Sequence, residues 1–152
     1  MKKWLWAAAL VVAADQAVKA LCLRLARPVT LIPGVLQLTY AENTGMAFSL
    51  FSGMPWILGV ISALCILAGW RILRRYRLGP VSRLAAMLML GGAAGNMLDR
   101  LFRGYVVDMF EPLFIRFAVF NIADAALTVG AVLMAATLLL CPDDWSETHG
   151  ST

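Results

Sequence analysis

Four apolar stretches, each close to the length of a membrane span, constrain the fold of this chain more than any other feature. They run approximately over Trp4–Leu23, Pro55–Leu73, Ser82–Leu101 and Val119–Cys141. A helix of ~20 apolar residues crosses the hydrocarbon core of a bilayer and satisfies its backbone hydrogen bonds internally, as lipid requires. Hydrophobic residues make up 61% of the 152 residues, compared with about 45–50% in soluble domains. The sequence therefore predicts an all-α membrane protein with four transmembrane helices, in a single domain over residues 1–152.

Basic residues predict how these helices are oriented. Lys2 and Lys3 precede the first stretch, and the connection between the second and third carries Arg71, Arg74, Arg75, Arg77 and Arg83. Cytoplasmic loops of membrane proteins carry an excess of lysine and arginine. We therefore expect both termini in the cytoplasm and the loops around residues 24–54 and 102–118 outside. The net charge of +4 does not indicate nucleic-acid binding, because the bases form no stripe with interleaved aromatic residues.

The first apolar stretch has two interpretations. Residues 1–14 combine a basic start, an apolar run and small residues, which is also the pattern of a cleaved signal peptide. Three later spans, together with the polar residues Asp15 and Lys19, favour a retained transmembrane helix.

The first outer loop contains a strand pattern. Apolar residues Leu36, Leu38 and Tyr40 alternate with Gln37 and Thr39, which is the period of a half-buried strand. Turn residues flank this segment, at Pro33-Gly34 and at residues 43–45. We expect a small β-sheet in the first outer loop, at the outer membrane surface. A second strand-like run covers Tyr105–Phe110.

Polar side chains occur on four separate segments at one expected depth, near the outer ends of the helices. They are Asp15, Lys19, Asn96, Asp99, Arg100, Asp108, Asn121 and Asp124. The inner halves of the same helices are almost purely apolar. Because each charge inside a bilayer costs about 2.5 kcal/mol or more, this convergence predicts one polar cluster near the outer interface.

Some of these residues have a structural explanation and others do not. Asp15 and Lys19 are one helical turn apart and can neutralise each other, and Asp99 stands beside Arg100, so both pairs are expected to hold the bundle together. Asp108 and Asp124 have no cation within one turn. An acid near lipid without a local partner indicates a functional site.

The residue inventory excludes most catalytic chemistries. The single histidine, His149, lies in the tail, away from the cluster, which excludes histidine triads and histidine-ligated zinc. A serine–lysine pair of Lys19 with Ser49 or Ser52 stays formally open, although Lys19 has a nearer partner in Asp15. Paired aspartates remain, because two carboxyl groups that share a proton can act as base and acid on one water. We expect neither a metal nor a cofactor.

Four blocks of residues also resemble a known family, lipoprotein signal peptidase (signal peptidase II). The blocks are Asp15–Lys19, Asn43–Ser49, Gly95–Asp108 and Phe120–Asp124. They follow one another in the family's order across nearly the whole chain. Each block alone is weak evidence, whereas the four together are specific.

The resemblance implies an aspartic endopeptidase of the bacterial cytoplasmic (inner) membrane, with its active site near the outer leaflet. Such enzymes remove signal peptides from prolipoproteins, cutting before a diacylglyceryl-modified cysteine, and are inhibited by globomycin. By motif, Asp108 and Asp124 correspond to the catalytic pair. Residues that correspond to substrate- or inhibitor-binding positions are Asn43, Gly45, Asn96, Arg100 and Asn121. Asp15, Lys19 and Asp99 correspond to structural polar positions. Ala125 departs from the serine that commonly follows the second aspartate.

Two other functions are compatible with buried carboxyl groups. A small ion or proton transporter would place polar residues at several depths, whereas here they stop at the outer half. A subunit that only binds a partner's helix would have no use for unpaired aspartates.

Overall fold

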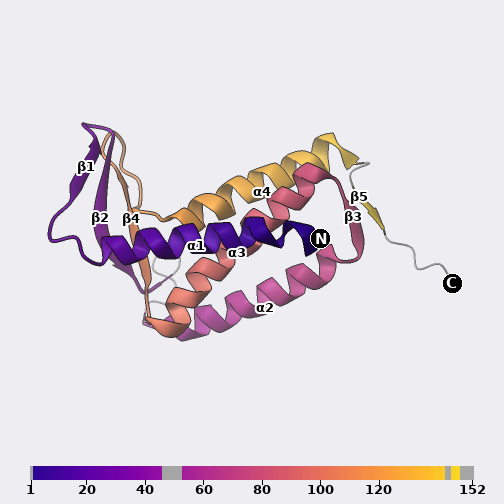
Figure 1. Ribbon diagram of the computed structural model, residues 1–152, viewed down its shortest axis with the longest axis horizontal. Helices are drawn as coiled ribbons and strands as arrows, with labels where there is room; N and C mark the ends of the chain where they lie inside the picture. Colours follow the sequence, from indigo (N-terminus) through magenta and orange to yellow (C-terminus); the bar gives the residue numbers. More distant parts are fainter. Residues whose placement is uncertain (1, 46–52, 143–144, 148–152) are drawn as a thin grey trace.

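Long helices dominate the computed structural model, which describes residues 2–45, 53–142 and 145–147. The helices are α1 (Leu5–Cys22), α2 (Pro55–Leu73), α3 (Pro80–Phe102) and α4 (Ile122–Leu140), and a short 3₁₀-helix, η1 (Lys2–Trp4), precedes α1. Figure 1 shows them side by side in one elongated bundle. Within the described residues, all four are long and apolar enough to cross a membrane. The predicted fold class is confirmed.

Two helix starts differ from the predicted ones, each for a local reason. Helix α3 begins at Pro80 rather than at Ser82, because proline is well suited to the first helical position. Helix α4 begins at Ile122 rather than at Val119, because the backbone of Phe120 pairs with that of Phe110 in an isolated β-bridge. Asn121 then caps the helix.

Helix α3 is the centre of the bundle, and it packs against α1, α2 and α4. Close approach depends on its glycines, because small residues let helix backbones come near each other. A Cβ atom added at Gly95 would lie 2.8 Å from Asp15 Oδ2 of α1. A Cβ atom added at Gly92 would lie only 2.4 Å from the backbone oxygen of Ala123 in α4. Glycine therefore brings the polar ends of three helices together.

A three-stranded antiparallel sheet covers one end of the bundle (Figure 1). Its strands are β1 (Val29–Ile32), β2 (Leu36–Asn43) and β4 (Val106–Pro112), in the order β1-β2-β4. The alternating pattern correctly predicted β2. The sheet is larger than expected, because β4 from the second outer loop joins it and places Asp108 opposite Ala41.

A second, smaller sheet lies at the opposite end (Figure 1). Strand β3 (Tyr76–Leu78), after α2, pairs with β5 (Trp145–Glu147) near the C-terminus. The Trp145 ring packs edge-on against Tyr76, with ring centroids 5.9 Å apart, and Leu78 is buried. The sequence pattern did not predict these strands.

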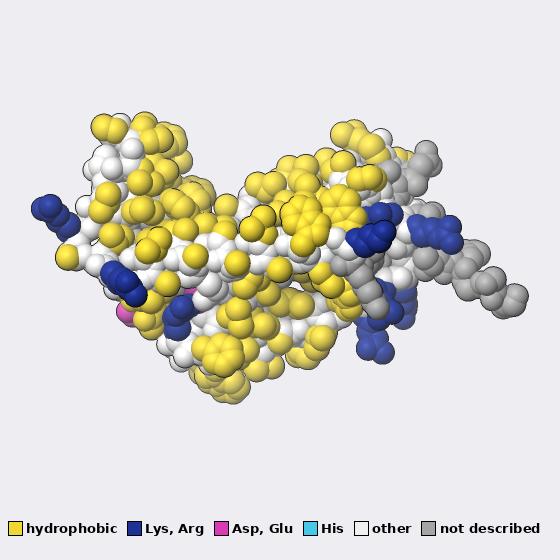
Figure 2. Space-filling view, viewed as in Figure 1, with side chains coloured by type: hydrophobic (Ala, Val, Ile, Leu, Met, Phe, Trp, Pro, Cys, Tyr) yellow, Lys and Arg dark blue, Asp and Glu magenta, His cyan; other side chains and the backbone are white. Residues whose placement is uncertain are grey.

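The surface of the bundle is apolar between its two ends. Figure 2 shows hydrophobic side chains across the middle of this face and lysine and arginine side chains at the ends. Leu10, Leu64 and Val132 are each at least 60% exposed. A continuous apolar surface of this kind is solvated by lipid rather than by water.

Candidate active site

Buried polar side chains meet where the helices approach the three-stranded sheet. Those that are 5% exposed or less are Asp15, Lys19, Asn96, Asp99, Asp108 and Asn121. They come from α1, α3, β4 and the start of α4. The structure therefore brings together the segments on which the sequence places its polar residues.

An ion network between α1 and α3 forms one half of this cluster. The Lys19 Nζ atom lies 2.8 Å from Asp15 Oδ2 and 2.7 Å from Asp99 Oδ2, and all three side chains are fully buried. Arg103 completes the network with a second ion pair to Asp99. The four charges balance, which buried ions require. The expected Asp15–Lys19 pair is present.

The predicted pairing of Asp99 with Arg100 is wrong. Asp99 pairs with Lys19 and Arg103 instead, because residues four apart share a helix face whereas adjacent residues do not. The Arg100 guanidinium donates from Nη2 to the backbone oxygen of Gly45 at 3.2 Å. It also interacts electrostatically with Asp124, Asp108 and Asp99.

The first turn of α4 positions Asp124 through helix capping. The Asp124 backbone N–H donates to Asn121 Oδ1 at 2.8 Å, and the Asn121 backbone N–H donates to Asp124 Oδ2 at 3.3 Å. These two bonds form a capping box. The other carboxylate oxygen, Oδ1, accepts from Asn96 Nδ2 at 2.7 Å. Helix α1 anchors the same turn, because Asp15 Oδ1 accepts from the Ala123 N–H at 3.0 Å.

Asp108 lies on β4 and is only 3% exposed. Its Oδ1 accepts from Asn121 Nδ2 at 2.6 Å, and its Oδ2 accepts from Asn43 Nδ2, on the paired strand β2, at 3.1 Å. The pKa of Asp108 is raised from 3.8 to about 6, mainly by burial and also by the charge of Asp124. The bonds from Asn43 and Asn121 and the charge of Lys19 oppose this rise. A carboxyl group with this pKa is half protonated at a pH of about 6, well above the range of an exposed aspartate.

Two amide groups connect the two carboxyl groups. Asn121 Nδ2 donates to Asn96 Oδ1 at 3.1 Å as well as to Asp108, while Asn96 donates to Asp124. The chain from Asp108 through Asn121 and Asn96 to Asp124 therefore consists of oriented hydrogen bonds. Such an arrangement can hold one ionised and one protonated carboxyl group at a single site.

An open recess adjoins this site. Its volume is about 320 Å³, and its lining consists of Phe117, Phe120, Asp124, Ala125, Thr128 and Val129. Asp124 is thus reachable from the surface, whereas Asp108 on β4 is buried. Ala125, the position that departs from the resemblance, contributes part of the wall.

Two network members were missed by the sequence reasoning. Gln16 donates from Nε2 to Asp99 Oδ1 at 3.0 Å and accepts from Arg103 at 2.8 Å. The sequence did contain a signal for Arg103, because Asp99 and Arg103 are four residues apart, which is the spacing of an ion pair on one helix face. Ser49, Ser52 and His149 lie outside the described residues.

Comparisons with known proteins identify the family. A family model described as signal peptidase (SPase) II matches residues 7–140. A lipoprotein signal peptidase from Latilactobacillus sakei is 40% identical over 112 residues, which is 73% of this chain and 74% of that protein. One from Streptococcus pyogenes serotype M1 is 41% identical over 117 residues, 76% of this chain and 73% of that protein.

Two solved structures, both described as bacterial membrane enzymes, have the same fold. One superposes with a TM-score of 0.86 at 27% sequence identity. The superposition covers 99% of this chain and 96% of the chain in that structure. The other gives a TM-score of 0.83 at 28% sequence identity, over 93% of this chain and 95% of the chain in that structure. This chain is a multi-pass bacterial membrane protein, and it belongs to the signal peptidase II family of aspartic peptidases.

Proposed function

We propose that this chain cleaves signal peptides from diacylglyceryl-modified prolipoproteins, before the lipidated cysteine, with Asp108 and Asp124 as the catalytic pair. Membership of the family supports the reaction. The observation that carries the residue assignment is the amide connection, in which Asn96 and Asn121 link the carboxyl groups of two different elements. The ion network, by contrast, has its charges internally paired.

The environments of the two aspartates favour different roles. Asp108, whose pKa is raised to about 6 by burial, acts as the protonated partner. Asp124 acts as the ionised partner, because both its oxygens accept N–H donors and it stands in the first turn of α4, where the helix dipole stabilises negative charge.

These roles give a balanced sequence of proton transfers. Asp124 accepts a proton from a water molecule, whose oxygen attacks the scissile carbonyl carbon. Asp108 donates its proton to the carbonyl oxygen and so stabilises the tetrahedral intermediate. On collapse of the intermediate, that proton returns to Asp108 as the carbonyl re-forms, and Asp124 passes its proton to the leaving amine. Both carboxyl groups are then in their starting states.

Activity should depend on pH through Asp108. We expect kcat/KM, which reports the free enzyme, to fall about tenfold per unit above a pH of about 6, because Asp108 loses its proton there. The measurement is the pH profile of prolipoprotein cleavage. The hydrogen bond from Asn43 lowers this pKa, so Asn43→Ala should move the alkaline limb to higher pH. A limb that stays in place in the variant would contradict the protonated role of Asp108.

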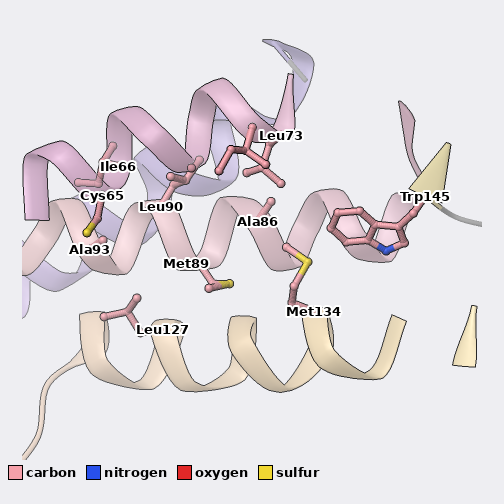
Figure 3. A pocket seen from close by; sticks show the side chains of 12 residues that line it. Cys65, Ile66, Leu73, Ala86, Met89, Leu90, Ala93, Leu127, Met134 and Trp145 are labelled. Atoms are coloured by element: carbon pink, nitrogen blue, oxygen red, sulfur yellow. The ribbon is translucent and has the colours of Figure 1, made fainter. Parts of the chain in front are cut away.

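An apolar groove provides a docking site for the signal-peptide helix. Figure 3 shows Met89, Leu90 and Ala93 of α3 between side chains of α2 and α4, with Trp145 at one end. The groove has a volume of about 390 Å³. Because its lining is almost wholly apolar, a hydrophobic helix can enter it from the bilayer. We expect the scissile bond then to lie near the polar end of the bundle.

Filling this groove should weaken substrate binding without harming the fold. A Cβ atom added at Gly69 would meet only Leu90 Cδ2, at 3.9 Å, so Gly69→Leu extends into the groove without a backbone clash. We expect KM to rise about tenfold, equivalent to losing ~1.4 kcal/mol of binding, with kcat near its original value. Steady-state cleavage kinetics measure this. Gly69→Ala is the matched control, and it should raise KM less because it adds a smaller side chain. An unchanged KM for Gly69→Leu would place the signal helix elsewhere.

We further propose that the three-stranded sheet and the active site face outward from the cytoplasmic membrane. The α2–α3 connection, whose sequence carries several arginines, lies at the opposite end from that sheet (Figure 1). In a background with Cys65→Ser and Cys141→Ser, Gln37→Cys should react with a membrane-impermeant thiol reagent in intact cells. Arg77→Cys should react only after permeabilisation. The reverse pattern would overturn this orientation.

Cleavage of a defined substrate tests the proposed function as a whole. The purified full-length protein, in detergent or lipid, is incubated with a diacylglyceryl-modified prolipoprotein and with its unmodified counterpart. We expect the modified substrate to be cut before the lipidated cysteine, and a globomycin-type inhibitor to block the cut. No cleavage, or equal cleavage of both substrates, would contradict the proposal.

A further inference from the structure

We propose that Lys19 is a positioning residue for Asp124, and that it acts by holding the side-chain amide of Asn96 in one orientation. The inference rests on the proposed catalytic pair. It goes beyond the structural role of the Asp15–Lys19–Asp99–Arg103 network, because it gives one member of that network an effect on the chemical step.

The orientation of Asn96 follows from what each neighbour can donate or accept. The Lys19 ammonium group is only a donor, and it lies 3.1 Å from Asn96 and is fully buried. The Asn96 atom that faces it must therefore be the oxygen. Asn121 Nδ2 donates to the same oxygen at 3.1 Å. The NH₂ group of Asn96 then faces Asp124 Oδ1, at 2.7 Å.

Reversing this amide would harm the proposed base. A flipped Asn96 would place its oxygen against the Asp124 carboxylate, so an attractive hydrogen bond would become a repulsion between two acceptors. Among the contacts of the described residues, its carboxylate would then keep the 3.3 Å backbone bond of the capping box. The ionised form of Asp124, which must accept a proton from water, would lose its shorter stabilising contact.

The other side-chain amide of the site, that of Asn121, is oriented without a contact from Lys19. The Asn121 oxygen accepts the Asp124 backbone N–H, and its NH₂ group donates to Asp108 and Asn96. Its orientation is thus set by the capped helix itself. Asn96 lies toward the C-terminal end of α3, and among the described contacts no backbone N–H donates to its side chain. Its oxygen is held by Lys19 together with Asn121, and of these two donors the Lys19 ammonium is the charged one.

A charge-balanced double variant separates this role from simple stabilisation. Asp15→Asn/Lys19→Met removes one negative and one positive charge, and leaves Asp99 with Arg103. An asparagine at 15 still has an oxygen to accept the Ala123 N–H. We expect kcat to fall about tenfold to hundredfold, less than the ~10²–10³-fold loss seen when a direct transition-state donor is removed, with KM unchanged. Asp15→Asn alone keeps Lys19 but removes its ion-pair partner, so its measured effect should be on thermal stability.

The route through Asn96 is tested by a double-mutant cycle on kcat. If Lys19 acts through the amide, adding the double variant to an Asn96→Ala background should cost no further kcat. A merely structural role would instead lower the amount of folded protein, measured by thermal unfolding, and leave kcat per folded molecule unchanged.

The outcomes distinguish this inference from the catalytic pair. Full kcat in the folded double variant, or the same loss in the Asn96→Ala background, overturns the inference. Asn96→Ala leaves the ion network intact, so it decides the question even if the double variant does not fold: an unchanged kcat for it also overturns the inference. Asp124→Asn is measured in parallel, and cleavage by that variant would overturn the catalytic pair instead.

Discussion

Asp108→Asn and Asp124→Asn are each expected to abolish prolipoprotein cleavage, with a fall in the single-turnover rate of about 10⁴-fold or more, the scale seen when one member of a catalytic unit is lost. Asparagine preserves the size of the side chain and one acceptor oxygen. It can neither take a proton from water nor hold one for the carbonyl oxygen. If the two carboxyl groups act as a unit, as proposed, combining both changes should cost little more than either one alone.

The measurement is cleavage of a lipidated prolipoprotein, with yield and thermal stability recorded for each variant. Asp99→Asn is the demanding control, because Asp99 is buried close to the same site. Its carboxyl group is engaged by Lys19 and Arg103, so the expected effect of the substitution is on stability. Near-normal cleavage by either the Asp108 or the Asp124 variant would rule out the pair. Loss of activity at Asp99 with full stability would shift the assignment there.

The fold and the composition of the site could largely be predicted because the bilayer restricts what a chain can do. Long apolar runs have few alternatives to helices in lipid, which is why α2 has the predicted bounds. Polar residues in such runs are expensive, so Asp15, Asn96 and Asp124 stood out against apolar neighbours. Their common depth in the membrane could be predicted from the position of each residue along its span.

Contacts between distant segments could not be predicted in the same way. The bond from Asn43 to Asp108 joins residues 65 positions apart and depends on the register between β2 and β4, which includes an irregularity between Leu38 and Ala41. Local alternation indicates a strand without naming its partner. The same limit applies to β3 and β5, whose three-residue pairing is too short to leave a periodic pattern.

The pairing of Asp99 was misjudged for a different reason. Adjacency in sequence suggested Arg100, although a helix turns about 100° per residue and so points neighbours in different directions. Helical geometry favoured Arg103, and the fold of α1 against α3 then supplied Lys19. Arg100 instead contacts the backbone oxygen of Gly45 and interacts with the charges of Asp108 and Asp124.

Gly92→Leu is expected to prevent stable folding of the bundle. Even a single Cβ atom at this position would lie 2.4 Å from the backbone oxygen of Ala123 and 2.9 Å from Leu127 Cγ. The Ala123 oxygen belongs to the first turn of α4 and cannot move alone, so α4 must shift as a unit. We expect a loss of stability larger than the about 1–3 kcal/mol typical of an overpacked core, and little folded protein after detergent extraction. Size-exclusion profiles and thermal unfolding measure this.

Gly69→Leu is the matched control for Gly92→Leu, because it makes the same change on a neighbouring helix where the space is open. It should fold with near-normal stability and lose only substrate affinity. Gly92→Ala should give an intermediate result: some folded protein, but slow cleavage, since any displacement of α4 moves the capping box that positions Asp124. If Gly92→Leu folded as well as Gly69→Leu, the contact between α3 and α4 would not be the constraint that sets the site geometry. If Gly92→Ala were stable and fully active, a displacement of α4 would not impair Asp124. The close packing of α3 against α4 would then not be needed to position this residue.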